Sequence, residues 1–139
     1  MTKKNLILIL SILIAATYSC KDQAKENSQM KSVMAIHDEV MPKMGTIGRL
    51  VAQLDEKITN DATSDDYASA REELKTAHKA MMDWMKGFGE RFDGDEILKG
   101  KTLTEEKQEW LDEEEAKMKA LRDQINSSIK KAEDLLEGN

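Results

Sequence analysis

Apolar residues recur at alternating spacings of three and four along three stretches of this chain, which is the pattern of an amphipathic helix with one buried face. The pattern predicts helices over residues 29–59, 64–88 and 103–137. The expected buried positions of the first helix are Val33, His37, Val40, Met44, Ile47, Val51, Leu54 and Ile58. Those of the second are Tyr67, Ala70, Leu74, His78, Met81, Met85 and Phe88. Those of the third are Leu111, Met118, Leu121, Ile125, Ala132 and Leu135, flanked by Trp110, Ile129 and Leu136.

Residues with capping preferences lie at the ends of these segments. Ser64 or Thr63 suits the N-cap of the second helix, because a hydroxyl accepts a hydrogen bond from a free backbone N–H. Thr102 followed by Glu105 has the spacing of a capping box before the third helix, and Gly138 suits its end.

One proline and two connections set the expected path of the chain. Pro42 has no N–H to donate to the carbonyl of Asp38, which predicts a kink in the first helix. The connection at residues 60–64 is short, so the first two helices should be antiparallel neighbours. Residues 86–100 contain four glycines and are expected to form a longer loop. Its apolar residues could cover the end of the core; they are Phe88, Phe92, Ile97 and Leu98.

The elements together predict an all-α protein built as an up-down-up three-helix bundle, since any one amphipathic helix of this kind is marginally stable alone. A long coiled coil is the alternative, because all three patterns keep the spacing of three and four. The glycine-rich connection and the polar interruptions at His37 and Glu114 argue against extended two-stranded pairing.

The first 20 residues have a different character from the rest of the chain. Lys3 and Lys4 precede an apolar run over 6–16, which is shorter than the about 20 residues that a membrane-spanning helix needs. The run ends in "TYSC", which resembles the lipobox of bacterial lipoproteins, in which the cysteine is acylated after cleavage just before it. We therefore expect a signal peptide at 1–19, a lipid-anchored flexible tether at 20–28 and a helical domain at 29–139. A plain secretory signal with an incidental cysteine is the alternative.

Charge and cysteine content narrow the expected partners. Cys20 is the only cysteine, so it cannot form an internal disulfide and is free to carry lipid. Loss of Lys3 and Lys4 with the signal peptide would lower the net charge from −6 to −8. A nucleic-acid partner is not expected, because phosphate binding needs a basic face. The membrane is the expected partner through the lipid, and another protein of the cell envelope could be a second one.

The only two histidines open two similar segments, "HDEVMPKM" at 37–44 and "HKAMMDWM" at 78–85. Positions i, i+4 and i+7 share one face of a helix, which groups His37, Met41 and Met44, and likewise His78, Met82 and Met85. A turn near residue 61 would bring His37 level with Met85, and Met44 level with His78.

Thioether sulfur and imidazole favour a soft ion such as Cu(I), so these six residues form a candidate metal site. Methionine also fills gaps in helical cores and serves adaptable partner-binding surfaces. We therefore expect these residues to serve packing or partner binding with no cofactor bound, and Cu(I) binding is the alternative.

Other chemistries match less well. A calcium loop that starts at Asp93 would place Ile97, Leu98 and Thr104 where an acid, a glycine and a glutamate belong, so a solvated acidic turn is expected instead. The Glu-x-x-His spacing of di-iron proteins is absent. The acidic run at 112–117 is expected to be a solvated helix face with Glu113 paired to Lys117. We expect no enzymatic activity.

With "HDEVMPKMGTIGRL" (37–50) and "MMDWMKGF" (81–88), the chain resembles a family of small bacterial lipoproteins of unknown function. Its members combine a lipobox, an "HDEVMPKM"-like helix, a "DWM"-like second helix and a charged third helix, and some are labelled as similar to viral A-type inclusion proteins. The resemblance implies a helical fold in the cell envelope and transfers no catalytic residue. The expected function is that of a lipid-anchored helical module with a binding or structural role, with Cu(I) binding as the alternative.

Overall fold

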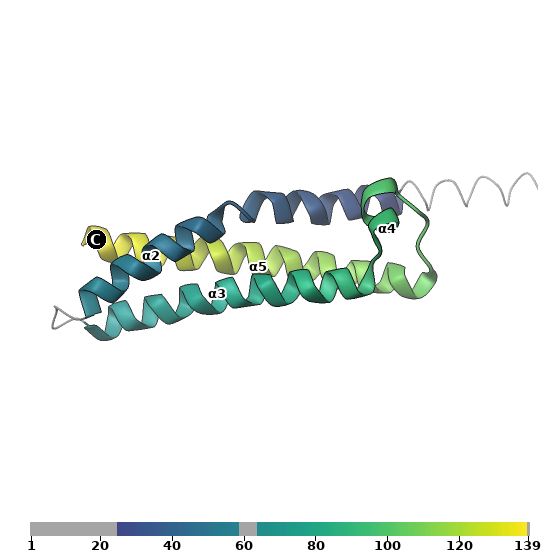
Figure 1. The fold of residues 1–139 in the computed structure, drawn as a ribbon. Coiled ribbons are helices and arrows are strands. Elements are labelled where there is room, and N and C mark those ends of the chain that lie inside the picture. The colour runs from purple at the N-terminus through teal and green to yellow at the C-terminus, as the bar shows by residue number, and fades with distance from the viewer. Residues whose placement is uncertain (1–24, 59–63, 139) are drawn as a thin grey trace, which may run out of the picture.

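The computed structural model describes residues 25–58 and 64–138, and helix is the only regular secondary structure in these two ranges. A helical segment over residues 25–40 is followed by α2 (Lys43–Ile58), α3 (Ser64–Arg91), α4 (Gly94–Lys99) and α5 (Glu105–Glu137) (Figure 1). The predicted all-α class is confirmed. The expected signal peptide at 1–19 and the lipid-bearing Cys20 lie outside the described residues.

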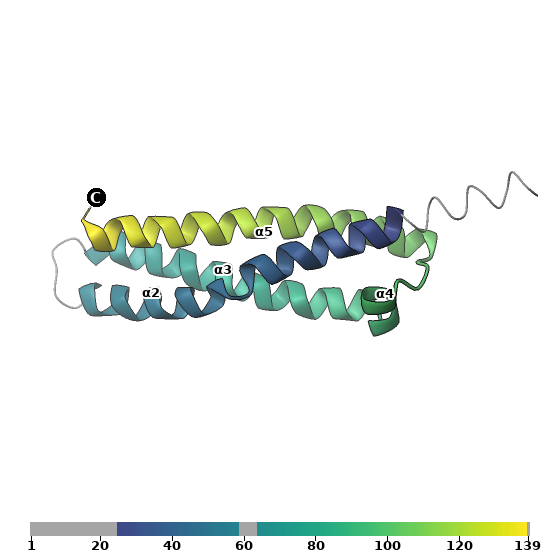
Figure 2. The same ribbon diagram turned by 90° about the horizontal axis from the view of Figure 1, so that it is seen from above.

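The long helices lie side by side, and the short α4 lies at one end of them (Figures 1 and 2). α3 packs against both α2 and α5, and α2 and α5 also touch. The aromatic rings of His37 and Trp84 are 5.9 Å apart, which is one position from the predicted pairing of His37 with Met85. Nearer the connection between α2 and α3, Arg71 Nη1 lies 2.7 Å from Asp55 Oδ1.

The predicted single helix over 29–59 is divided at Pro42. Residues 41 and 42 form a turn between the segment 25–40 and α2, and the chain changes direction there (Figure 1). Met41 N–H still donates to His37 at 2.9 Å, whereas Met44 N–H donates to the carbonyl of Met41 at 3.1 Å, three residues back instead of four. The expected kink is therefore a full interruption, because Pro42 removes a donor and its ring blocks the preceding turn.

The first residues of the structure correct the boundary of the tether. Residues 25–28 were expected to be flexible, and they are helical. Glu26 Oε2 accepts a hydrogen bond from Leu103 N–H at 3.4 Å. A Cβ on Gly100 would stand 2.7 Å from Asn27 Oδ1, so the backbone at Gly100 lies against Asn27. These contacts hold the start of the first segment to the connection before α5.

The core follows the predicted helix faces with small rotations. Before residue 59 the buried stripe includes Met30, Ile36 and Leu50, which the predicted seam omits, because a helix that touches two neighbours buries a stripe wider than one seam. On α3 the predicted buried positions have two successive spacings of four residues, from Ala70 to Leu74 and from Leu74 to His78. The second spacing is three in the structure, so Ala77 is buried in place of His78. His78 is exposed. The buried positions of α3 are Ala70, Leu74, Ala77, Met81, Trp84 and Phe88.

The prediction that residues 86–100 form a loop is wrong. α3 continues to Arg91 through two of the four glycines, and α4 occupies residues 94–99. Asp93 caps α4: its side chain accepts from the N–H groups of Asp95 and Glu96, and Glu96 accepts from Asp93 N–H in return. Gly100 ends α4 in the left-handed conformation with φ of 68°, which favours glycine. The acidic turn that was predicted to be solvated is therefore the start of α4, and its glutamate, Glu96, is buried.

The start of α5 also differs from the prediction. Thr104, not Thr102, is the N-cap, and its hydroxyl accepts from Lys107 N–H at 3.3 Å. Residue Glu105 is the first helical residue and so cannot complete a capping box with Thr102. Gly138 ends α5 with φ of 78°, as predicted.

Candidate functional site

The two predicted histidine ligands have different surroundings. The side chain of His37 is 18% exposed, and its Nδ1 lies 2.9 Å from Oδ1 of Asp38. The imidazole also lies near the indole of Trp84, with the two ring planes at an angle of 34°. His78 is exposed on α3. The structure therefore places only His37 in a defined contact with its neighbours.

The four predicted methionine ligands are half-buried and pack against the core; they are Met41, Met44, Met82 and Met85. Residues 25–58 and 64–138 contain no group of three or more His, Cys, Asp or Glu side chains that could hold a metal ion. A metal in this region would depend on methionine sulfur. The register between His37 and Trp84 brings the first histidine beside the second motif.

The sequence analysis did not predict an aromatic row that runs along the last turns of α3 and ends at Phe92, the residue directly after the helix. The rings of Trp84 and Phe88 stack 4.8 Å apart, and those of Phe88 and Phe92 are also 4.8 Å apart. His37 adds a fourth ring at the Trp84 end. The spacing of four residues between Trp84, Phe88 and Phe92 is the signal that could have revealed the row, because such residues share one helix face.

Trp84 carries the feature with the clearest chemical meaning. It is 9% exposed, and its indole Nε1 is buried without a hydrogen-bond partner among the described residues. A buried N–H without an acceptor costs about 1–3 kcal/mol relative to one that is bonded. Buried tryptophans usually find an acceptor for this group. The indole N–H of Trp84 is therefore a donor in need of an acceptor.

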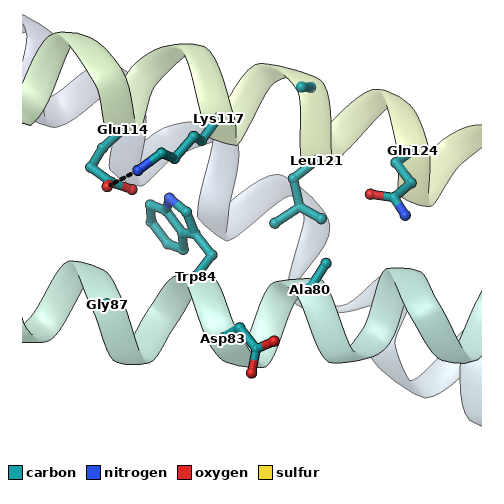
Figure 3. A pocket seen from close by; sticks show the side chains of 9 residues that line it. Ala80, Asp83, Trp84, Gly87, Glu114, Lys117, Leu121 and Gln124 are labelled. Atoms are coloured by element: carbon teal, nitrogen blue, oxygen red, sulfur yellow. Dashed lines mark hydrogen bonds and ion pairs between the residues drawn. The ribbon is translucent and has the colours of Figure 1, made fainter.

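Trp84 borders a groove of about 530 Å³ between α3 and α5 (Figure 3). The groove exists because three positions along it carry little or no side chain, namely Ala80, Gly87 and Ala120. Leu121 and the face of the indole supply apolar surface. The rim is polar and consists of Asp83, Glu114, Lys117 and Gln124.

Glu114 is the polar side chain that the fold buries most completely at this groove. It is 3% exposed, although it belongs to the acidic run that was expected to be solvated. Its Oε1 receives Lys117 Nζ and Arg91 Nη1, each at 2.9 Å. The prediction of a solvated face is wrong at this position, because two cations replace the water that the carboxylate gives up. Figure 3 shows the Glu114–Lys117 pair above the nitrogen-bearing side of the indole.

Arg91 joins the groove to the exposed part of α5. Its Nη1 also contacts Glu113 at 2.8 Å, and its guanidinium lies 5.4 Å from the ring centroid of Trp110. The hydrogen bond from Arg91 lowers the pKa of Glu113, and the same bond, together with the charge of Glu114, raises the pKa of Arg91. The predicted pair of Glu113 with Lys117 is present at 3.8 Å. Arg91 is thus fixed by two carboxylates and an aromatic ring.

This arrangement can bind but offers no arranged nucleophile. It presents an apolar floor, an ammonium group on Lys117 and a neutralised carboxylate, with one buried indole N–H donor beside them. A group with an acceptor next to an apolar body matches all of these features.

Comparisons of the chain with protein-family models, with curated protein sequences and with solved structures found no match. Among the residues that the structure describes, none of the helices is both long enough and apolar enough to cross a membrane. The functional assignment below therefore rests on the residues themselves.

Proposed function

We propose that this chain is a lipid-anchored helical binding module of the bacterial cell envelope. In this proposal the signal peptide ends at residue 19 and Cys20 carries the lipid, as the lipobox pattern indicates. The helices form an up-down-up three-helix bundle that serves as a rigid scaffold and not as an enzyme. The pairwise packing of α2, α3 and α5 supports this scaffold.

The observation that carries the binding role is the unpartnered indole N–H of Trp84 beside the groove. We assign the groove to an apolar segment of another envelope protein. Because Nε1 is buried, such a partner must open the local packing before its carbonyl or carboxylate oxygen can accept from this N–H. An apolar centre with a polar rim is the usual composition of a protein interface, and buried tryptophan is enriched where binding energy concentrates. The rim of Asp83, Lys117 and Gln124 suits that composition.

Site-directed photocrosslinking in the intact envelope tests this role. A photoreactive residue at Ala120 lies in the groove, and one at the exposed Ala52 of α2 is the control. We expect one defined protein adduct from position 120 and none from position 52. The same set of adducts from both positions would refute the groove as the binding site.

Gly87 provides a matched pair of blocking variants. A Cβ at Gly87 would meet no atom within 4 Å outside its own helix backbone and chain neighbours, so a side chain can start into the groove from this position. Gly87→Leu fills the space and should abolish the adduct at position 120, whereas Gly87→Ala should retain it. Both substitutions should raise helix stability by up to about 1 kcal/mol, so a lost adduct cannot be attributed to unfolding.

The anchor has its own test. Cys20→Ser removes the thiol that would be acylated, so radiolabelled palmitate should label the native protein and not the variant. Label that persists in the variant would show that the lipid, if any, lies elsewhere. Native protein that carries no label and stays out of the membrane fraction would overturn the anchor.

Cu(I) binding is the second candidate, favoured by half-buried methionines on two adjoining helices beside His37. An anaerobic Cu(I) titration against a competing chelator measures it. Substitution of His37 by leucine should weaken binding more than the same change at the exposed His78, if His37, Met41, Met44, His78, Met82 and Met85 act as proposed. Affinity weaker than micromolar, or unchanged by the double substitution, would eliminate the site.

A further inference from the structure

The end of the molecule that contains α4 presents an apolar side chain to solvent. Leu98 is 82% exposed, and no other large hydrophobic side chain in residues 25–58 and 64–138 is exposed. Its neighbour Ile97 packs against the core, so α4 has one apolar side chain facing inward and one facing outward. A single exposed leucine is ordinary on a protein surface and does not by itself indicate a contact site. The location of Leu98 in the molecule is therefore the more informative observation.

That position is next to the start of the described chain. Asn27, Met30 and Lys31 line the same small depression as Ile97 and Leu98, so α4 lies against the first helical segment. Both views place α4 and the purple start of the first helical segment at one end of the molecule (Figures 1 and 2). An extended chain covers at most about 3.5 Å per residue, so Cys20 lies within roughly 18 Å of residue 25.

Four lysines near this end are exposed, namely Lys25, Lys31, Lys99 and Lys101. Lys31 and Lys99 line the same depression as Leu98. Lys99 and Lys101 form ion pairs with Asp95 at 2.7 Å and with Asp93 at 2.8 Å. Two of the four lysines are thus neutralised by carboxylates of their own segment, so the acyl chains and not these charges would supply most of the hold on a membrane. Lysine stems can nevertheless extend along an interface and place their ammonium groups among phosphates.

We infer that residues 97–101, called the α4 tip from here on, contact the bilayer to which the lipid on Cys20 is attached. Leu98 enters the interfacial region, and the nearby lysines lie at the level of the headgroups. The inference rests on the proposed lipid anchor. The acyl chains supply the affinity, and the α4 tip sets the orientation of the domain.

This orientation has a consequence for the groove. The 33 residues of α5 extend about 50 Å at 1.5 Å per residue, so the domain would stand away from the membrane as a rod. Lys117 and Leu121 lie 12 and 16 positions after Glu105, which places the groove roughly 20 Å from the membrane-facing end. The proposed partner would then be met above the membrane surface and not within it.

Fluorescence quenching on the acylated protein tests the inference. Acylation occupies the thiol of Cys20, so Leu98→Cys provides a single site for an environment-sensitive fluorophore. Ala52→Cys, near the opposite end of the molecule, is the control. Both labelled proteins are reconstituted into phosphatidylcholine–phosphatidylglycerol vesicles that contain a brominated lipid. We expect quenching at position 98 to be at least about threefold stronger than at position 52.

Two outcomes are distinguishable from each other. Protein that floats with the vesicles but is quenched equally at both positions overturns the contact of the α4 tip and leaves the lipid anchor standing. Protein that carries no lipid and does not float overturns both. A second label at Lys99→Cys tests Leu98 itself: adding Leu98→Glu should abolish its quenching without reducing flotation. Quenching that survives this change overturns the role of Leu98.

Discussion

The two histidines and the two buried glutamates contrast sharply in where the fold places them. His37 and His78 occupy positions of the predicted apolar seams, yet one is half-buried and the other exposed. Glu96 and Glu114 belong to acidic stretches expected to be solvated, yet they are 5% and 3% exposed. The repeated spacing of the histidines therefore does not predict their burial. The burial of the two glutamates depends on the lysine and arginine side chains that lie close enough to neutralise them. Lys107 reaches Glu96 at 2.7 Å, and Arg91 with Lys117 reaches Glu114.

The largest effect in this comparison is expected from Glu114→Ala. It leaves Arg91 and Lys117 without the carboxylate that both contact, although both cations can turn toward water. We expect the free energy of unfolding to fall by about 2 kcal/mol, the magnitude of lost charged hydrogen bonds. Denaturant unfolding followed by circular dichroism measures it.

Glu113→Ala is the matched control for that change. Glu113 neighbours Glu114 on α5 and also contacts Arg91, but its side chain is 55% exposed. Its loss should lower the free energy of unfolding much less than the loss of Glu114, because exposed ion pairs contribute little to stability. Equal losses at the two positions would show that burial does not set the difference.

Glu96→Ala should have the next largest effect. It removes the ion pair with Lys107 and one half of the capping box that starts α4. We expect a loss of about 1–2 kcal/mol, in the range of helix-cap substitutions. Hydrogen exchange should increase first at residues 94–99, with the α3–α5 contacts still protected. Asp95→Ala, which loses only an exposed pair with Lys99, should cost less.

The histidines themselves should differ by a smaller amount. His37→Ala loses the ring contact with Trp84 and half-buried area, which should cost about 1 kcal/mol. His78→Ala should stay within about 0.5 kcal/mol of the parent, as for other surface changes. Thermal unfolding of the two variants side by side gives the comparison. A greater loss at His78 would contradict the burial described above.

The sequence predicted those features that depend on local periodicity. It predicted the helical class, the disturbance at Pro42, the end of α5 at Gly138 and the approximate register of His37 with the second motif. It failed where contacts between distant segments decide the outcome. The burial of Glu114 needs Arg91 from another helix. The path of residues 100–103 needs Asn27 and Glu26 from the start of the domain.

The candidate groove illustrates the same limit. Ala80, Gly87 and Ala120 are unremarkable in the sequence and form a hollow only when α3 and α5 are brought together. The unpartnered state of the Trp84 N–H is likewise a property of the packed helices. The histidine and methionine residues could be proposed as metal ligands from the sequence, because that chemistry depends on residue type alone.

Asp93 separates pairing from burial within the segment that contains Glu96, and its effect depends on pH. Asp93 is exposed, but the hydrogen bond from Lys101 and those from the N–H groups of Glu96 and Asp95 lower its pKa from 3.8 to about 2. A carboxyl whose pKa is lower in the folded state stabilises the fold above pH 3.8, and this contribution is lost as the pH falls toward 2. Asp93→Asn keeps a capping side chain and removes the charge, so it should unfold more readily than the parent at pH 5 and match it near pH 2. Melting temperatures between these limits measure the effect, and a difference that does not shrink with acid would mean that the cap, and not the charge, carries it.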